Sequence, residues 1–194
     1  CSTVGPYAKY GTLLVEACIE SKTNYCDITG ETHWIREIID KYHTKAIKNK
    51  VKIVHACGFD SIPSDFGVFY AQNKIKENSG KYASKISMRV ISMKGGISGG
   101  TIYSFLNIIE ESRKNKNIKK VLNNPHGLSP NKDLFDSDEE DLKKIIFDST
   151  SKKWIGPFVM AAINTRIVRR SNYLMDFKYG RDFIYNEALV FGRS

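Results

Sequence analysis

Short apolar stretches and amphipathic stretches alternate through the first third of the chain. Apolar residues cluster at 1–4, 24–28 and 51–57, the lengths of strands, whereas residues 10–18 and 32–48 repeat apolar side chains at helical spacing. This strand–helix–strand–helix–strand order has short connections and predicts a parallel sheet with right-handed crossovers. The predicted apolar faces are Tyr10, Leu13, Leu14, Ala17 and Cys18 in the first helix, and Ile35, Ile38, Ile39, Tyr42 and Ala46 in the second.

The rest of the chain mixes helices and strands in a less regular order. Pro63 opens a helix, which is a favoured place for proline, and Phe66, Phe69 and Tyr70 would form its apolar face. The elements predicted after it are a strand at 85–93, a glycine-rich turn at 95–100, a helix at 101–114, a loop-rich surface insertion at 123–151, a helix at 158–170 and a strand at 183–191.

The net charge of +9 lies almost entirely beyond residue 60. A basic excess can indicate nucleic acid, an anionic surface or a phosphorylated ligand, or simply lysine-rich helix faces in water. No nucleic-acid-binding motif accompanies the charge, so we expect no nucleic-acid partner.

The cysteines and the apolar runs indicate in which cellular compartment the protein would be found. The four cysteines form no CxxC pair, so we expect no metal site and a reducing, intracellular and cytoplasmic location. No apolar run reaches the roughly 20 residues of a membrane-spanning helix. Because residues 1–4 already resemble the end of a strand, we expect the chain to be a fragment with residues upstream.

Small and polar residues follow each of the three predicted strands, at 3–7, 27–31 and 58–65. Ligands of open parallel sheets bind beyond the carboxyl ends of the strands, where glycine lets a cofactor approach the backbone. The plainer interpretation is that glycine and proline only shape the loops. The GxGxxG dinucleotide motif is absent, so either it lies upstream or no dinucleotide binds. The candidate cofactor contacts are Val4, Gly5, Pro6, Thr29, Gly30, Glu31, Gly58 and Phe59.

Residues 96–100 match GxSxG between a predicted strand and a predicted helix, which is the setting of a nucleophilic serine. A hydrolase using Ser98 would need a downstream acid and histidine. His126 is the only later histidine, and Glu110 and Glu111 are the only acids between them. The plainer interpretation is a backbone turn against a substrate or a neighbouring domain.

The other histidines have different settings. His33 and His43 lie on a charged helix, and we expect them to be solvated. His55 lies inside a strand, where it could belong to the core or point toward a pocket and transfer a proton.

Several motifs together resemble the saccharopine dehydrogenase-like oxidoreductases, and within them the bacterial trans-acting enoyl reductase branch. The most specific is GFDSIPSD at 58–65, and the likeness runs over nearly the whole chain. The other matching segments are 4–7 with 10–11, 27–31, 99–101, 157–164, 168–172 and 179–183.

The resemblance implies an α/β protein with two parts. Residues 1–80 would be the C-terminal half of a Rossmann NAD(P)-binding domain with a parallel sheet, and residues 81–194 an incomplete α+β substrate domain. The family's N-terminal glycine-rich loop has no counterpart here, so we expect this piece alone to be inactive and to bind cofactor weakly or not at all. Gly99, Gly100 and Thr101 are the expected substrate contacts.

The resemblance also implies a reductase that uses NADPH or NADH. Its substrate would be a small molecule or a carrier-bound unsaturated (enoyl) acyl chain, or an imine. Such a reaction needs one proton, and Tyr7, His55, Asp60 and Asp65 are the ionisable groups nearest the predicted crevice. Water is an alternative proton source.

Two further possibilities concern partners. The same fold could serve as a non-enzymatic interaction module that uses its basic second half, and a homodimer stays open. The apolar segment 154–163 is flanked by Lys152, Lys153, Arg166, Arg169 and Arg170, a pattern that suits an anionic lipid surface. The alternative is a buried helix with solvated ends.

Overall fold

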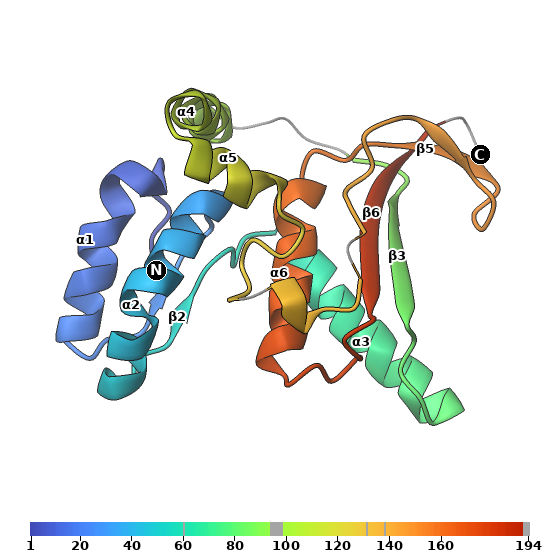
Figure 1. Ribbon diagram of the computed structural model, residues 1–194, viewed down its shortest axis with the longest axis horizontal. Coiled ribbons are helices and arrows are strands. Elements are labelled where there is room, and N and C mark those ends of the chain that lie inside the picture. Colours follow the sequence, from blue (N-terminus) through green and yellow to red (C-terminus); the bar gives the residue numbers. More distant parts are fainter. Residues whose placement is uncertain (60, 94–98, 131, 138, 192–194) are drawn as a thin grey trace. The chain divides into compact units, whose positions relative to one another are not determined.

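The computed structural model describes residues 1–59, 61–93, 99–130, 132–137 and 139–191 (Figure 1). It divides into two compact units. The first comprises Cys1–Phe59 with Gly96–Leu128, and the second comprises Asp60–Gly95 with Ser129–Ser194. Within the described residues, no helix is long and apolar enough to cross a membrane.

The first unit contains the predicted parallel strands. Strand β1 (Tyr25–Cys26) pairs in parallel with β2 (Ile53–Val54), and Ser2 forms a parallel bridge to Asp27. The parallel alignment of these three segments is therefore confirmed. Helices α1 (Tyr7–Glu20) and α2 (Thr32–Asn49) connect them and pack against each other.

Helix α2 buries the face that its apolar spacing predicted, with Ile35, Ile38 and Tyr42 at most 2% exposed. The prediction for α1 was wrong. Leu13 is 78% exposed, and the buried residues are Tyr7, Gly11, Val15 and Ile19. The physical reason is Gly11, whose missing side chain lets the buried indole of Trp34 lie against the helix. A Cβ there would stand 2.6 Å from Trp34 Cζ2.

Two helices of the first unit come from much later in the chain. Helix α4 (Gly99–Lys114) leads into α5 (Lys116–Asn123), and α5 packs on α2. Lys9, in the first turn of α1, places its Nζ 5.4 Å from the centre of the Tyr103 ring on α4.

The second unit contains a four-stranded sheet in the order β3-β6-β5-β4. Strand β3 runs parallel to β6, whereas β5 is antiparallel to both β4 and β6. The separate second sheet predicted from the sequence is confirmed. The strands are β3 (Lys85–Val90), β4 (Ile146–Asp148), β5 (Lys153–Gly156) and β6 (Ile184–Phe191), and a short 3₁₀ turn, η1, spans Lys132–Leu134.

Helices α3 (Ile62–Ser79) and α6 (Ala161–Leu174) pack together on one face of this sheet (Figure 1). Their core joins Val68 of α3 and Val168 of α6 to Tyr185 of β6. The predicted apolar face of α3 is wrong, because Phe66 and Phe69 are 58% and 41% exposed.

Helix α3 is instead held by a polar side chain. Gln72 is fully buried, donates from Nε2 to the Ala83 carbonyl at 2.9 Å and accepts from the Ala83 N–H at 2.8 Å. These two hydrogen bonds tie the helix to the segment that enters β3.

Two other expectations differ from the structure. The segment 123–151 is not simply a surface loop, since His126 and Leu128 are at most 2% exposed and β4 lies within it. The compact units also group the chain differently from the predicted boundary near residue 80, because α3 joins the second unit while α4 and α5 join the first. Assignment of 1–80 to a cofactor domain and 81–194 to a substrate domain stays a prediction.

Candidate functional site

Asp27 organises the strand ends of the first unit. Its side chain is fully buried just after β1. Oδ1 accepts the backbone N–H groups of Thr29 at 3.1 Å and Ala56 at 3.0 Å, and Oδ2 lies 2.6 Å from His55 Nδ1. Three contacts from two strand ends hold one carboxylate in place. The sequence placed Asp27 at a strand end but gave it no role.

His55 lies between aromatic rings. Its side chain is 7% exposed, and its ring meets those of Trp34 and Tyr25 edge to face, with centres 5.1 and 6.0 Å apart. The Asp27 carboxylate accepts the proton on Nδ1, which leaves Nε2 as the nitrogen able to exchange a proton. Nε2 is buried and has no hydrogen-bond partner among the described residues.

Tyr7 begins α1 beside this pair. Its hydroxyl donates to the Ser2 carbonyl at 3.0 Å, and its ring centre lies 5.5 Å from that of Trp34. Burial raises the pKa of the Tyr7 phenol, and the nearby Asp27 and Glu31 carboxylates raise it further. Tyr7 therefore keeps its proton at neutral pH.

Glu31 has a structural task at the start of α1. Its side chain is almost fully buried, and its oxygens accept the N–H groups of Tyr7 at 2.8 Å and Ala8 at 2.9 Å. These two N–H groups have no partner within the helix and lie at its positive end, where a carboxylate is stabilising. Both hydrogen bonds would have to be given up if Glu31 turned toward a cofactor, so its cofactor role stays a prediction.

The remaining candidate cofactor contacts lie at the same strand ends. Val4, Gly5, Gly30 and Phe59 are exposed, Gly58 is half-buried, and Pro6 and Thr29 are buried. Thr29 holds the loop, because its hydroxyl oxygen accepts the Glu31 N–H at 3.1 Å. A Cβ on Gly30 would meet open space, so the backbone there is accessible.

Asp60 and Ser98 lie outside the described residues. Gly99, Gly100 and Thr101 form the first turn of α4, and only their helical backbone is described. Of the two histidines expected to be solvated, His43 is exposed, but His33 is 7% exposed and that prediction was wrong.

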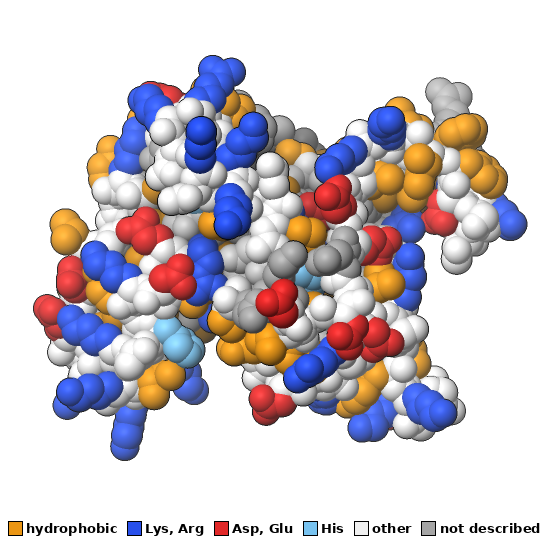
Figure 2. Space-filling view, viewed as in Figure 1, with side chains coloured by type: hydrophobic (Ala, Val, Ile, Leu, Met, Phe, Trp, Pro, Cys, Tyr) orange, Lys and Arg blue, Asp and Glu red, His pale blue; other side chains and the backbone are white. Residues whose placement is uncertain are grey.

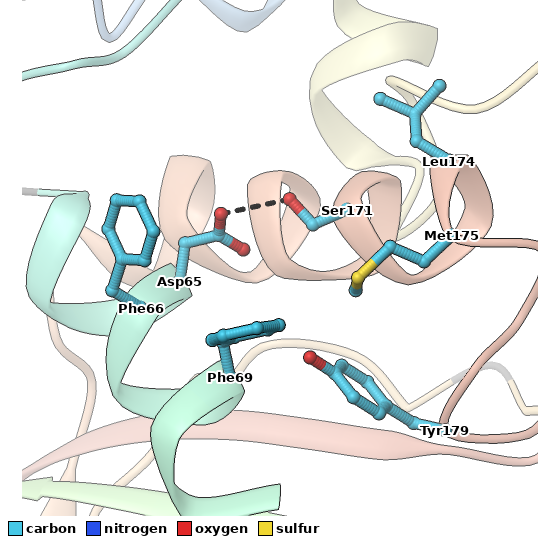
Figure 3. Close-up of a pocket in the computed structure, with 7 residues that line it drawn as sticks. All are labelled: Asp65, Phe66, Phe69, Ser171, Leu174, Met175 and Tyr179. Carbon is cyan, nitrogen blue, oxygen red and sulfur yellow. Dashed lines mark hydrogen bonds between the residues drawn. The ribbon is translucent and has the colours of Figure 1, made fainter. Parts of the chain in front are cut away.

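Asp65 belongs to the second unit and is not part of the Asp27–His55 cluster. It lines a cavity of about 290 Å³ with Phe66, Phe69, Ser171, Leu174, Met175 and Tyr179 (Figure 3). The Ser171 hydroxyl donates to Asp65 Oδ2 at 2.9 Å. Burial raises the pKa of Asp65, and the Ser171 hydrogen bond partly offsets this. Burial and the Asp65 charge raise the pKa of Tyr179 to about 12.

The basic residues expected at a lipid surface are partly buried. Arg166 is 4% exposed and forms an ion pair with Asp141, and Arg169 is 3% exposed and donates to the Glu139 carbonyl at 2.8 Å. These two guanidinium groups are used inside the unit, as the alternative of a buried helix requires, and contact of this segment with a lipid surface stays a prediction.

In amino-acid sequence the chain is similar to trans-acting enoyl reductases along its whole length. It is 40% identical over 199 residues to the Mycobacterium tuberculosis protein named "Putative trans-acting enoyl reductase". It is 36% and 34% identical over 201 residues to the trans-acting enoyl reductases of Mycobacterium ulcerans and Mycobacterium bovis. The alignments cover 100% of this chain and 48% of each relative, so the chain spans about half the length of these relatives.

Two other comparisons gave no match, since neither a family model nor a solved structure resembles the chain significantly. The enoyl reductase part of the resemblance is supported by the named relatives. Membership of the wider saccharopine dehydrogenase-like group stays a prediction.

Proposed function

We propose that this chain is part of an NAD(P)H-dependent reductase of enoyl substrates, acting on an unsaturated acyl chain bound to a carrier. Similarity over the whole chain to proteins named trans-acting enoyl reductases is the observation that carries the proposal. The buried Asp27–His55 pair at the ends of parallel strands supports it, because ligands of such sheets bind at that edge.

The residues present fit the nicotinamide end of such a cofactor better than its pyrophosphate. Open backbone at Gly30 and exposed Val4 and Gly5 leave room for a flat ring to approach the strand ends. The first N–H groups of α1, which could hold a phosphate, are already taken by Glu31. The pyrophosphate would therefore need donors other than the N-terminus of α1.

When bound, the nicotinamide supplies a hydride to the double bond. His55 would supply the matching proton from Nε2, and the Asp27 carboxylate would hold the imidazole in place through Nδ1. Because Nε2 is shielded from solvent, the substrate must displace the residues that cover it. Tyr7, which holds its proton firmly, would position the strand-end loop through its bond to Ser2.

The test is oxidation of NADPH and NADH by the full-length protein with a panel of enoyl thioesters and imines. His55→Gln should lower kcat/KM for the preferred substrate by about 10²–10⁴-fold, the usual contribution of a general acid. His43→Gln, on the exposed side of α2, is the matched control and should leave the rate unchanged.

Two outcomes would contradict the proposal. Full activity of His55→Gln would remove the proton-transfer role. Absence of cofactor oxidation with every substrate, together with no heat on calorimetric titration with either nucleotide, would favour a non-enzymatic interaction module.

A further inference from the structure

The end of α4 and the first part of α5 together have the sequence RKNKNIKK at 113–120, with five cations and no acid. Arg113, Lys114, Lys116, Lys119 and Lys120 are all exposed, and we call them the basic face. Lys114 forms an ion pair with Glu110. No carboxylate in the described part of the chain pairs with the other four. Lysine and arginine side chains gather over these two helices (Figure 2).

The lysines of α5 are not needed for its packing. Asn117, Ile118 and Val121 line a hollow against α2, together with the cap residue Asn115. With 100° of rotation per residue, positions 116, 119 and 120 point away from that side. The basic face is therefore available to a partner.

Helix physics alone does not explain this concentration of charge. Cations in the last turns of α4 and α5 complement the helix dipole, but Lys116 stands in the first turn of α5, where a cation is unfavourable. Lys116 also repels Lys119 and Lys120, which lie three and four residues along the same helix.

The basic face lies in the same unit as the Asp27–His55 pair and near the same edge. Helix α5 packs on the first half of α2, beside His33 and Arg36, and α2 begins directly after Glu31 of the strand-end loop. Helix α4 lies by the first turn of α1, through Tyr103 and Lys9. A partner on α4 and α5 would thus sit beside the strand ends.

We propose that the basic face docks an acidic carrier domain that presents the acyl chain to the strand-end site. This partner assignment rests on the proposed function. Charge complementarity selects the occupant, since a surface of one sign steers a partner of the opposite sign and speeds their encounter.

The experiment compares two substrates with the same enoyl chain, using the full-length protein with NADPH. One chain is attached to an acidic acyl carrier protein and the other to N-acetylcysteamine, which carries no charge. The triple variant Lys116→Glu, Lys119→Glu and Lys120→Glu should raise KM for the carrier substrate about tenfold or more at low salt. Its kcat, and both constants for the small thioester, should not change. The effect should shrink as salt rises, because exposed charges are screened within about 8 Å at physiological ionic strength.

The matched control reverses three exposed lysines at the opposite end of the strands and helices, Lys22→Glu, Lys48→Glu and Lys52→Glu. It makes the same change in net charge and should leave KM unaltered. An equal loss in this control, or an unchanged KM in the basic-face variant, would overturn the docking proposal. The docking proposal would also be overturned if the basic face bound anionic vesicles or RNA while its reversal left KM for the carrier substrate unchanged.

Failure of the proposed function can be distinguished from failure of the docking proposal. If wild-type protein reduces neither substrate, the enzymatic proposal fails, yet fluorescence anisotropy with labelled carrier protein still tests docking. Salt-sensitive binding that the basic-face variant loses would support the docking surface, and absence of binding would refute it.

Discussion

Gly11 decides which side of α1 enters the core, and its replacement by alanine tests that conclusion. The added Cβ would stand 2.6 Å from Cζ2 and 3.0 Å from Cη2 of Trp34. The indole has little freedom to move, because it is fully buried and its Nε1 donates to Thr12 Oγ1 at 3.0 Å. Its ring also contacts Tyr7 and His55.

Two effects of opposite sign determine the free energy. Alanine in place of a helical glycine stabilises by about 0.5–1 kcal/mol, whereas overpacking a rigid core costs about 1–3 kcal/mol. The clash is with a buried ring rather than a flexible tip, so we expect Gly11→Ala to destabilise the first unit by about 1–2 kcal/mol net.

Gly67→Ala is the matched control, because Gly67 lies within α3 and a Cβ there meets nothing within 4 Å. It should stabilise the second unit by about 0.5–1 kcal/mol. The assay is urea unfolding followed by tryptophan fluorescence and circular dichroism. The two tryptophans, Trp34 and Trp154, lie in different units, so a Trp154→Phe background isolates the first unit for Gly11→Ala, and the Gly67→Ala protein keeps Trp154 as the reporter of the second. A Gly11→Ala protein as stable as its parent would refute the packing argument.

Three further predictions concern the candidate residues. Glu31→Gln should destabilise the first unit by about 1.5–3 kcal/mol, the value of a hydrogen bond to a charged group, whereas exposed Glu37→Gln should have little effect in the same urea assay. Burial raises the pKa of Asp65, so the contribution of this carboxyl group to stability is full below its unfolded pKa and is lost as pH rises through its folded pKa. Asp65→Asn should therefore flatten the decline of stability with pH. Ser171→Ala should raise the pKa of Asp65 further, as measured by a carboxyl NMR titration. A fluorophosphonate probe should leave Ser98 unlabelled, because the sequence offers no convincing acid and base for it, and clear labelling would support the hydrolase alternative.

The sequence by itself determined the elements whose patterns are local. The repeated isoleucines of α2 mark its buried face because side chains three and four residues apart lie on one side of a helix. The alternation of short strands and helices determined the parallel alignment of the first three segments, because short crossovers permit few other topologies. The final strand was also predicted within one residue of β6.

Only the tertiary structure decided the faces of α1 and α3. The aromatic and aliphatic residues of both helices repeat at helical spacing, yet contacts distant in sequence bury the other side. Trp34 meets the flat surface at Gly11, and Gln72 satisfies the backbone of Ala83. A hydrophobicity pattern predicts neither the close approach that a glycine allows nor a hydrogen-bond partner distant in sequence.

The candidate site also combines residues that the sequence indicates with contacts that only the tertiary structure creates. Tyr7 and Glu31 could be selected from the sequence because small and polar residues at strand ends are local signals, and His55 because it is a histidine inside a predicted strand. The pairing of His55 with Asp27 could not, since 28 residues separate them and only the parallel register of β1 and β2 brings them together. The sequence also gave no sign that α4 and α5 return to the first unit, where their basic face lies beside the strand ends. The sequence determines which side chains are present, but the distances that bring them together into a site arise only when the strands align and the helices pack.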